Sequence, residues 1–330
     1  MMTTPVVLFI FKRLKAVEIV KRIAIAKPSR LYIIADGPRN KEEFQDVQNC
    51  RKAVESAIDW DCEVIKNYSE GNRGVYQNIG EGAKWVFRNE KRAIFLEDDN
   101  LPESTFFQYC EDLLEKYNDE DKILWICGTN YIESYQTPQG YDYLFTRHML
   151  PCGWASWSHK FLKYYDGYLE TLSKVDIRQL KKFYLPKALY YTMKSHWMGE
   201  YIRMQNGDRA SSWDYQMDFS IKANALYGIC PTKNQIRNIG VDDYSIHGGN
   251  TKKKTMTDRF CDKKTYPLSF PLSGPEKIST DYVFEKKLGC IILPPLKDRL
   301  ISYILKIIRK IFAIPYNQTT TAYFKNKIKL

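Results

Sequence analysis

The stretch AIFLEDD at residues 93–99 decides the fold, because a short apolar run there turns abruptly into three carboxylates. An apolar run of about 4–8 residues with polar segments on both sides is typical of a strand buried in a sheet. Similar runs lie at 5–11, 31–36, 62–67 and 123–130, separated by segments with helical spacing at 17–25, 41–57, 75–87 and 106–117. The first 130 residues therefore predict βαβ units and an α/β fold with a mainly parallel sheet flanked by helices.

The alternation stops after Asn130, and aromatic residues become frequent in YDYLF (141–145), GWASW (153–157) and LYYTMKSHW (189–197). We expect irregular helices and short strands there, packed over one edge of the sheet as an aromatic-rich lobe. The sequence thus predicts three parts: 1–130 as the first half of the fold, 131–275 as the aromatic-rich half, and 276–330 as a basic extension.

The net positive charge of the protein comes from the last part of the chain. The net charge is +11, and residues 251–330 hold 17 Lys and Arg against 6 Asp and Glu, so the remainder is neutral. A neutral body has no general basic field, and we therefore predict no nucleic-acid partner.

The segment LKDRLISYILKIIRKIF (296–312) has apolar residues at helical spacing and a polar stripe. The stripe consists of Arg299, Ser302, Lys306, Arg309 and Lys310. Such a helix suits an anionic membrane surface, with its apolar side inserted and its cations on the headgroups. The alternative is an ordinary C-terminal helix docked on the body, with its charges as the solvated face.

The cysteine spacing and the hydropathy indicate in which cellular compartment the protein is expected. None of the eight cysteines forms a Cys-x-x-Cys pair, so neither a zinc ribbon nor a dithiol motif is expected. The N-terminus lacks the pattern of a signal peptide, and no stretch reaches about 18 apolar residues. We expect reduced thiols in a cytoplasmic protein that is peripheral on the membrane if 296–312 docks there.

The carboxylates Glu97, Asp98 and Asp99 stand where an apolar strand leaves the sheet. Side-by-side negative charges need compensation, and hard divalent ions such as Mg²⁺ or Mn²⁺ take oxygen ligands and bridge diphosphates. The triplet therefore suits a metal–nucleotide site. Its alternative is a solvated turn, or the cap of the helix that follows.

Other catalytic motifs are missing from the sequence. The glycines in GNRGVYQNIGEGAKW (71–85) form neither a P-loop nor a dinucleotide fingerprint. There is no G-x-S-x-G elbow and no H-E-x-x-H motif, and the four histidines are few for a multi-histidine metal site.

Four passages resemble one enzyme family across roughly residues 5–275. They are PVVLFIFKR (5–13), FLEDDNLPESTFFQYCEDLL (95–114), LPCGWASW (150–157), and SSWDYQMD (211–218) followed by SIHGG (245–249). These passages resemble the GT-A nucleotide-sugar glycosyltransferases, in particular the inverting N-acetylglucosaminyltransferase I family and bacterial hemolysin-like glycosyltransferases. The resemblance implies a GT-A fold, in which the aromatic-rich half faces the acceptor.

The resemblance also implies roles for individual residues. Arg13 and Asp36 would hold the base and ribose, Asp98 would face the ribose, and Glu97 the donor sugar. Asp99 would ligate Mn²⁺ or Mg²⁺, with His247 on a late loop that closes over the diphosphate. Asp214 would be the general base, although Tyr215 replaces the family's second aspartate and Asp218 could share the role. The alternative for Asp214 is a helix N-cap.

The sequence is therefore interpreted as an inverting hexosyl- or N-acetylhexosaminyltransferase. It would use a nucleotide-sugar donor, UDP-linked by the resemblance, and a glycan or lipid-linked glycan acceptor in bacterial surface-polysaccharide synthesis. Two alternatives remain. A nucleotidyltransferase making activated sugars shares the sheet, but its glycine-rich loop is replaced by Phe11-Lys12-Arg13-Leu14. A non-catalytic membrane-binding protein would leave the carboxylate triplet unexplained.

Overall fold

The computed structural model describes residues 2–241, 254–315, 320 and 323–324. Up to Cys127 the chain alternates strands and helices as predicted. In order these are β1 (Val6–Ile10), α1 (Ala16–Ala26), β2 (Arg30–Ala35), α2 (Phe44–Ser56), β3 (Glu63–Tyr68), the π-helical turn η1 (Tyr76–Gly80), α3 (Glu81–Phe87), β4 (Arg92–Glu97), β5 (Asn100–Pro102), α4 (Phe106–Lys116) and β6 (Ile123–Cys127).

The later part of the chain adds strands to the same sheet as well as helices. These elements are β7 (Tyr143–Thr146), β8 (Trp154–Trp157), α5 (Ser158–Tyr164), the 3-10 helix η2 (Ile177–Phe183), α6 (Lys187–Gln205), α7 (Asp214–Ala223), β9 (Tyr227–Pro231), β10 (Ile236–Asn238), α8 (Lys254–Phe260), α9 (Tyr282–Ile292) and α10 (Leu296–Ile311). The division at residue 130 remains a prediction, since strands from both sides of it share the sheet.

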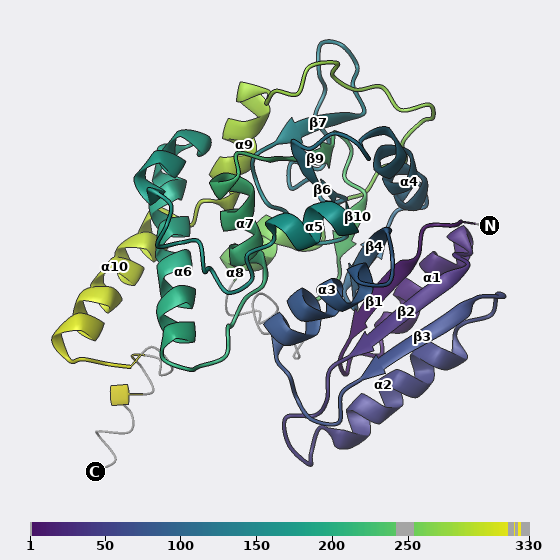
Figure 1. Cartoon of the computed structure of the whole chain (residues 1–330), viewed down its shortest axis with the longest axis horizontal. Helices are drawn as coiled ribbons and strands as arrows, with labels where there is room; N and C mark the ends of the chain where they lie inside the picture. The colour runs from purple at the N-terminus through teal and green to yellow at the C-terminus, as the bar shows by residue number, and fades with distance from the viewer. Residues whose placement is uncertain (1, 242–253, 316–319, 321–322, 325–330) are drawn as a thin grey trace.

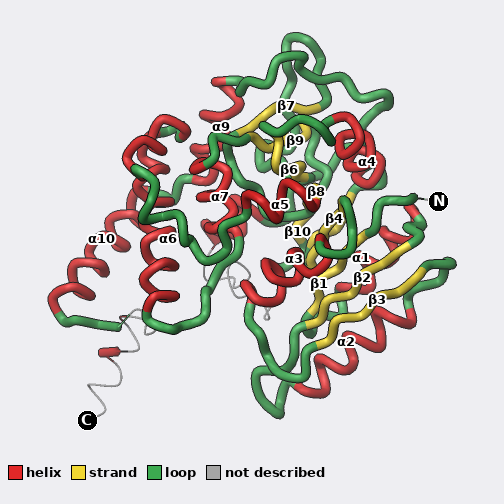
Figure 2. The backbone as a smooth tube through the Cα atoms, viewed as in Figure 1, coloured by secondary structure: helices red, strands yellow, loops and turns green. Residues whose placement is uncertain are grey.

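The central sheet is mainly parallel, which confirms the predicted fold class. Its strand order is β3-β2-β1-β4-β8-β6-β9-β7 (Figure 2). The strands β3, β2, β1 and β4 are parallel neighbours, and so are β6 and β9, whereas β8 and β7 run antiparallel to their neighbours. The carboxyl ends of β1, β2 and β4 therefore meet at one edge of the sheet, where ligand sites of such folds lie.

Helices cover both faces of the sheet, because its strands are apolar on both sides. On one face the core includes residues of α1, α2 and α4, and on the other residues of α3, α5, α7 and α9 (Figure 1). A third, smaller core joins η2, α6 and α7 beside the sheet, with Tyr184, Trp197 and Phe219 in it.

The expectation that GWASW packs over an edge of the sheet is wrong. Its last four residues form β8, which lies inside the sheet between β4 and β6. Trp154 is 1% exposed and stacks on Phe95 at 3.9 Å and on Trp125 at 4.3 Å between ring centroids. All four residues of β8 are buried, and its one polar side chain, Ser156, donates to the Leu124 carbonyl oxygen at 2.7 Å, so the strand is suited to the interior of the sheet.

A separate two-stranded sheet fastens the late part of the chain beside the carboxylates. The strand β5 begins directly after Asp99, and β10 pairs with it antiparallel, with Ile236 opposite Pro102 and Asn238 opposite Asn100. The Ile239 N–H then donates to the Asp99 carbonyl oxygen at 2.8 Å. This pairing holds residues 236–240 against the end of β4.

Candidate active site

Arg13 and the carboxylates that follow β4 meet at the carboxyl edge of the sheet. The strands β1 and β4 are paired, with Phe9 opposite Glu97, so the chain segments after both strands leave the sheet together. One guanidinium nitrogen of Arg13, Nη1, contacts Asp98 Oδ1 at 2.9 Å and Asp99 Oδ2 at 3.0 Å. Arg13 thus binds two of the three carboxylates of the triplet.

The three adjacent carboxylates oppose one another's ionisation. Burial raises the pKa of Glu97 well above its usual range, and the neighbouring charges of Asp99, Asp98 and Asp214 raise it further. Burial and the Asp99 charge raise the pKa of Asp98 to about 6, although Arg13 opposes the shift. The triplet is therefore a place where an additional cation would be stabilised.

Asp214 belongs to the same electrostatic cluster, because its charge contributes to the raised pKa of Glu97. It is the first residue of α7, and its Oδ1 accepts a hydrogen bond from the Ser212 hydroxyl. The Ser212 hydroxyl oxygen in turn accepts the Tyr215 N–H at 3.1 Å. Ser212, and not Asp214, therefore supplies the side-chain cap of the helix. A serine just before a helix is a common cap signal.

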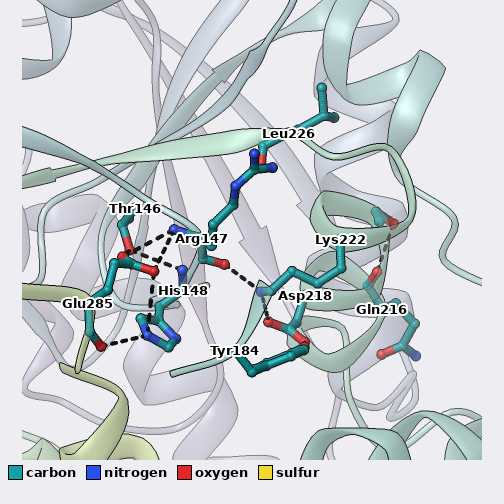
Figure 3. A network of polar contacts seen from close by, with 10 residues as sticks. Thr146, Arg147, His148, Tyr184, Gln216, Asp218, Lys222, Leu226 and Glu285 are labelled. Carbon is teal, nitrogen blue, oxygen red and sulfur yellow. Dashed lines mark hydrogen bonds and ion pairs between the residues drawn. The ribbon is translucent and has the colours of Figure 1, made fainter. Parts of the chain in front are cut away.

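Asp218, the alternative base, is part of the core. It is 4% exposed, and its carboxylate accepts hydrogen bonds from Lys222 and from the Tyr184 hydroxyl (Figure 3). Lys222 is fully buried and also donates to the Arg147 carbonyl oxygen. The pair anchors α7 to the chain that follows β7, and a role for Asp218 as a base at the surface is not supported.

A second buried acid, Glu285 of α9, extends this network (Figure 3). Its carboxylate accepts hydrogen bonds from the Thr146 hydroxyl and from the Arg147 N–H at 3.2 Å. His148 Nε2 lies 3.0 Å from the Glu285 carbonyl oxygen, and Arg147 Nη1 donates to the Leu226 carbonyl oxygen at 2.6 Å. These bonds link α7, α9 and the end of β7, so the helix that carries Asp214 has a fixed position.

Asp36 follows β2 at the same edge, and its N–H donates to the Ile10 carbonyl oxygen at 3.1 Å. Its carboxylate accepts hydrogen bonds from Gly37 N–H, Arg73 N–H, Gly74 N–H and the Asn72 side chain, at 2.6–3.1 Å. These donors belong mainly to residues 72–74, so Asp36 shapes that loop. Its contact with a ribose stays a prediction.

Arg73 is a cation at this edge that sequence reasoning missed. Its guanidinium donates to Asn67 Oδ1 at 3.0 Å and to Asn78 Oδ1 at 2.9 Å, and burial lowers its pKa. The signal in the sequence was the pair of glycines around it in GNRG (71–74), and Gly74 has a φ of +86°. These glycines match no phosphate-loop pattern, so the known motifs do not indicate this loop.

In the described ranges, no three His, Cys, Asp or Glu side chains converge in the manner of a preformed metal site. The carboxylates Glu97, Asp98 and Asp99 nevertheless fit a divalent cation, because carboxylate oxygens are the ligands that Mg²⁺ and Mn²⁺ prefer. His247, the second predicted ligand, lies outside the described residues.

No family model matches the chain, and no curated protein matches it. Solved structures of similar fold include a UDP-glucose pyrophosphorylase complexed with UDP-glucose, at 12% identity and a TM-score of 0.35, covering 73% of this chain and 94% of that one. A mannosyltransferase from Pyrobaculum calidifontis in complex with GDP-Man and Mn²⁺ is 9% identical with a TM-score of 0.33, covering 68% and 70%. Mouse xyloside xylosyltransferase 1 is 11% identical with a TM-score of 0.32, covering 67% and 81%. At these TM-scores and identities we draw no conclusion from the likeness.

Proposed function

We propose that the protein is an inverting, divalent-metal-dependent glycosyltransferase that moves a hexosyl or N-acetylhexosaminyl group from a UDP-linked donor to a hydroxyl group. One observation carries the proposal: Asp214 of α7 shares an electrostatic cluster with the carboxylates after β4, and the charges of Asp98, Asp99 and Asp214 together raise the pKa of Glu97. The divalent metal ion that accompanies a nucleotide diphosphate would supply positive charge at this cluster. A carboxylate at the other side of the cluster serves as the base.

Each residue of the candidate site has its own role in the proposed reaction. Asp99 would hold Mn²⁺ or Mg²⁺, with His247 as a further candidate ligand, and the bound metal ion would neutralise the diphosphate leaving group. Arg13 keeps Asp98 and Asp99 in place by contacting both. Glu97 and Asp98 would orient the donor sugar and ribose, and Asp36 would order the loop at 72–74.

The transfer itself needs one proton acceptor. The acceptor oxygen attacks the anomeric carbon, the bond from that carbon to the diphosphate oxygen breaks, and the hydroxyl proton passes to Asp214. The Ser212 hydroxyl positions the Asp214 carboxylate by donating to Oδ1. We propose a glycan or lipid-linked glycan as acceptor, in bacterial surface-polysaccharide synthesis at the cytoplasmic side of the membrane.

Replacing Asp99 by Ala should abolish the Mn²⁺-dependent part of UDP binding, because the metal ion loses its direct ligand. The fold should remain, since Arg13 keeps its contact with Asp98. Calorimetric titration of UDP with and without Mn²⁺ measures this effect. Asp262→Ala is the matched control, because it removes an exposed carboxylate that pairs with the exposed Arg237. Unchanged UDP affinity in Asp99→Ala would remove Asp99 from the metal site.

A methyl group at residue 240 should weaken the same binding without touching a carboxylate. A Cβ on Gly240 would lie 2.3 Å from Asp99 Oδ2, so Gly240→Ala must turn the Asp99 side chain away. We expect a loss of Mn²⁺-dependent UDP affinity smaller than that of Asp99→Ala. Gly199→Ala is the control, because a Cβ there meets no atom within 4 Å. Parent-like Mn²⁺ dependence in Gly240→Ala would show that this face of Asp99 is not used.

The nucleotidyltransferase alternative makes a different product. It would join a nucleoside triphosphate to a sugar 1-phosphate and release pyrophosphate, whereas a glycosyltransferase consumes the nucleotide-sugar and releases UDP. Assaying both products with a panel of nucleotide-sugars and sugar 1-phosphates separates the two. Pyrophosphate release without UDP release would contradict the proposed function.

A further inference from the structure

The helix α10 exposes its apolar side to solvent, which is the reverse of a helix packed on a core. None of its residues is buried. The outward stripe, which we call the α10 stripe, is 43–70% exposed and consists of Leu296, Leu300, Tyr303, Ile304, Ile307 and Ile311. In Figure 1, α10 lies at the outer side of the molecule next to α6. A contiguous apolar surface of this kind marks an interaction site.

The polar stripe of α10 is unevenly exposed: Arg299 and Arg309 are half-buried, whereas Ser302, Lys306 and Lys310 are exposed. Burial lowers the pKa of Lys306, and the Lys306 charge helps burial to lower the pKa of His196 on α6. Arg309 Nη1 donates to the Ile314 carbonyl oxygen at 3.2 Å. Lys306 and Arg309 therefore lie on the part of α10 nearer to α6 and the chain that follows.

Cations border the α10 stripe. At about 100° per residue around a helix, Lys297 falls on one margin of the stripe and Lys310 on the other, and both are exposed. The only acid in α10 is Asp298, on the side away from the stripe, and residues 251–330 carry the whole net charge of +11. The α10 stripe is thus apolar with one exposed lysine on each margin, and past Lys297 the apolar surface continues to Ile301 and Leu305, which are 45% and 40% exposed.

The charges beside the α10 stripe favour one kind of binding partner over another. Two copies of the chain joined through the α10 stripe would bring their rim lysines together, and like charges repel. Six side chains on one helix are also far fewer than the roughly 20–30 residues that each partner contributes to a stable protein interface. An anionic bilayer surface offers acyl chains to the stripe and negative headgroups to the rim.

We propose that α10 docks in the plane of an anionic lipid bilayer, with the α10 stripe inserted among the lipids. Within the described part of the chain, no helix is both long and apolar enough to cross a membrane, so docking of this kind is interfacial. The docking does not rest on the proposed function.

Vesicle binding by the full chain tests the docking without any assay of activity. The parent should cosediment with vesicles of phosphatidylcholine and phosphatidylglycerol, bind pure phosphatidylcholine weakly, and be released by added salt. Leu300→Gln with Ile304→Gln should lower the partition onto anionic vesicles about tenfold or more, because two inserted side chains become polar. Its thermal unfolding should match the parent, since these side chains are 54% and 53% exposed.

The matched control makes two exposed apolar side chains polar on another surface of the protein. Ile25→Gln with Phe44→Gln changes side chains that are 57% and 53% exposed on or beside α1 and α2, and it should bind vesicles like the parent. The docking is overturned if the parent ignores anionic vesicles or if the α10 variant binds them as the parent does. It is also overturned if analytical ultracentrifugation shows a parent dimer that the α10 variant loses, because a second copy would then occupy the stripe.

Discussion

Asp214→Asn should lower turnover about 10²-fold or more while donor affinity stays nearly unchanged. Asparagine keeps the shape of the side chain but cannot take the proton from the acceptor hydroxyl. The helix should remain folded, since the Ser212 hydroxyl oxygen provides the cap by accepting the Tyr215 N–H. UDP release, measured with a donor and acceptor pair that the parent uses, reports turnover, and calorimetry reports donor affinity.

The control for this variant is Asp208→Asn, which removes a carboxylate from the loop before α7 without touching the cluster. It should turn over like the parent. A parent-like rate in Asp214→Asn would exclude Asp214 as the base. Because Asp218 is buried against Lys222 and Tyr184, the search would then turn to Glu97 and not to Asp218.

Lys222→Met should lower the free energy of unfolding by about 3–5 kcal/mol, because it leaves the buried Asp218 carboxylate without its cation. The Lys222 side chain is fully buried, and that of Asp218 is 6% exposed. The Arg147 carbonyl oxygen also loses a donor in this variant. Urea unfolding measures the loss.

A surface pair of the same kind provides the comparison. Lys66 contacts Glu55 with side chains that are 45% and 35% exposed, so Lys66→Met should change stability by about 1 kcal/mol or less. Adding Asp218→Asn to Lys222→Met should recover part of the loss, because the unpaired charge is removed. Equal losses for Lys222→Met and Lys66→Met would mean that water reaches the buried pair.

Local patterns predict the strands of the first half well but not their neighbours. Val6–Ile10 and Arg92–Glu97 are apolar runs with polar ends, and each became a strand where the pattern indicated one. The sequence of β8 also indicates a strand, yet nothing local says that it pairs with β4 and β6. That pairing depends on Trp154 stacking between Phe95 and Trp125, which come from distant parts of the chain.

The candidate site was predictable where its residues follow a strand, and not where its supports are buried polar groups. Asp99 stands out because three carboxylates end an apolar run. Lys222 does not stand out in the sequence. Asp218 and Lys222 are four residues apart, which is the spacing of an ordinary surface ion pair on a helix, and lysine is rarely buried. Only the packing of α7 against η2 and the end of β7 shows that this pair lies in the core.

The pairing of β5 with β10 determines when, during folding, the carboxylates after β4 can reach their final positions. The strands β1 to β4 are complete early in the sequence, but the end of β4 acquires its cover only when Ile236 reaches Pro102. Contacts of such sequence separation form late, because a long loop must close before the contact stabilises it. We expect a nascent chain to form the parallel strands first, and its carboxylates to reach their final positions only after residues 236–240 have been synthesised.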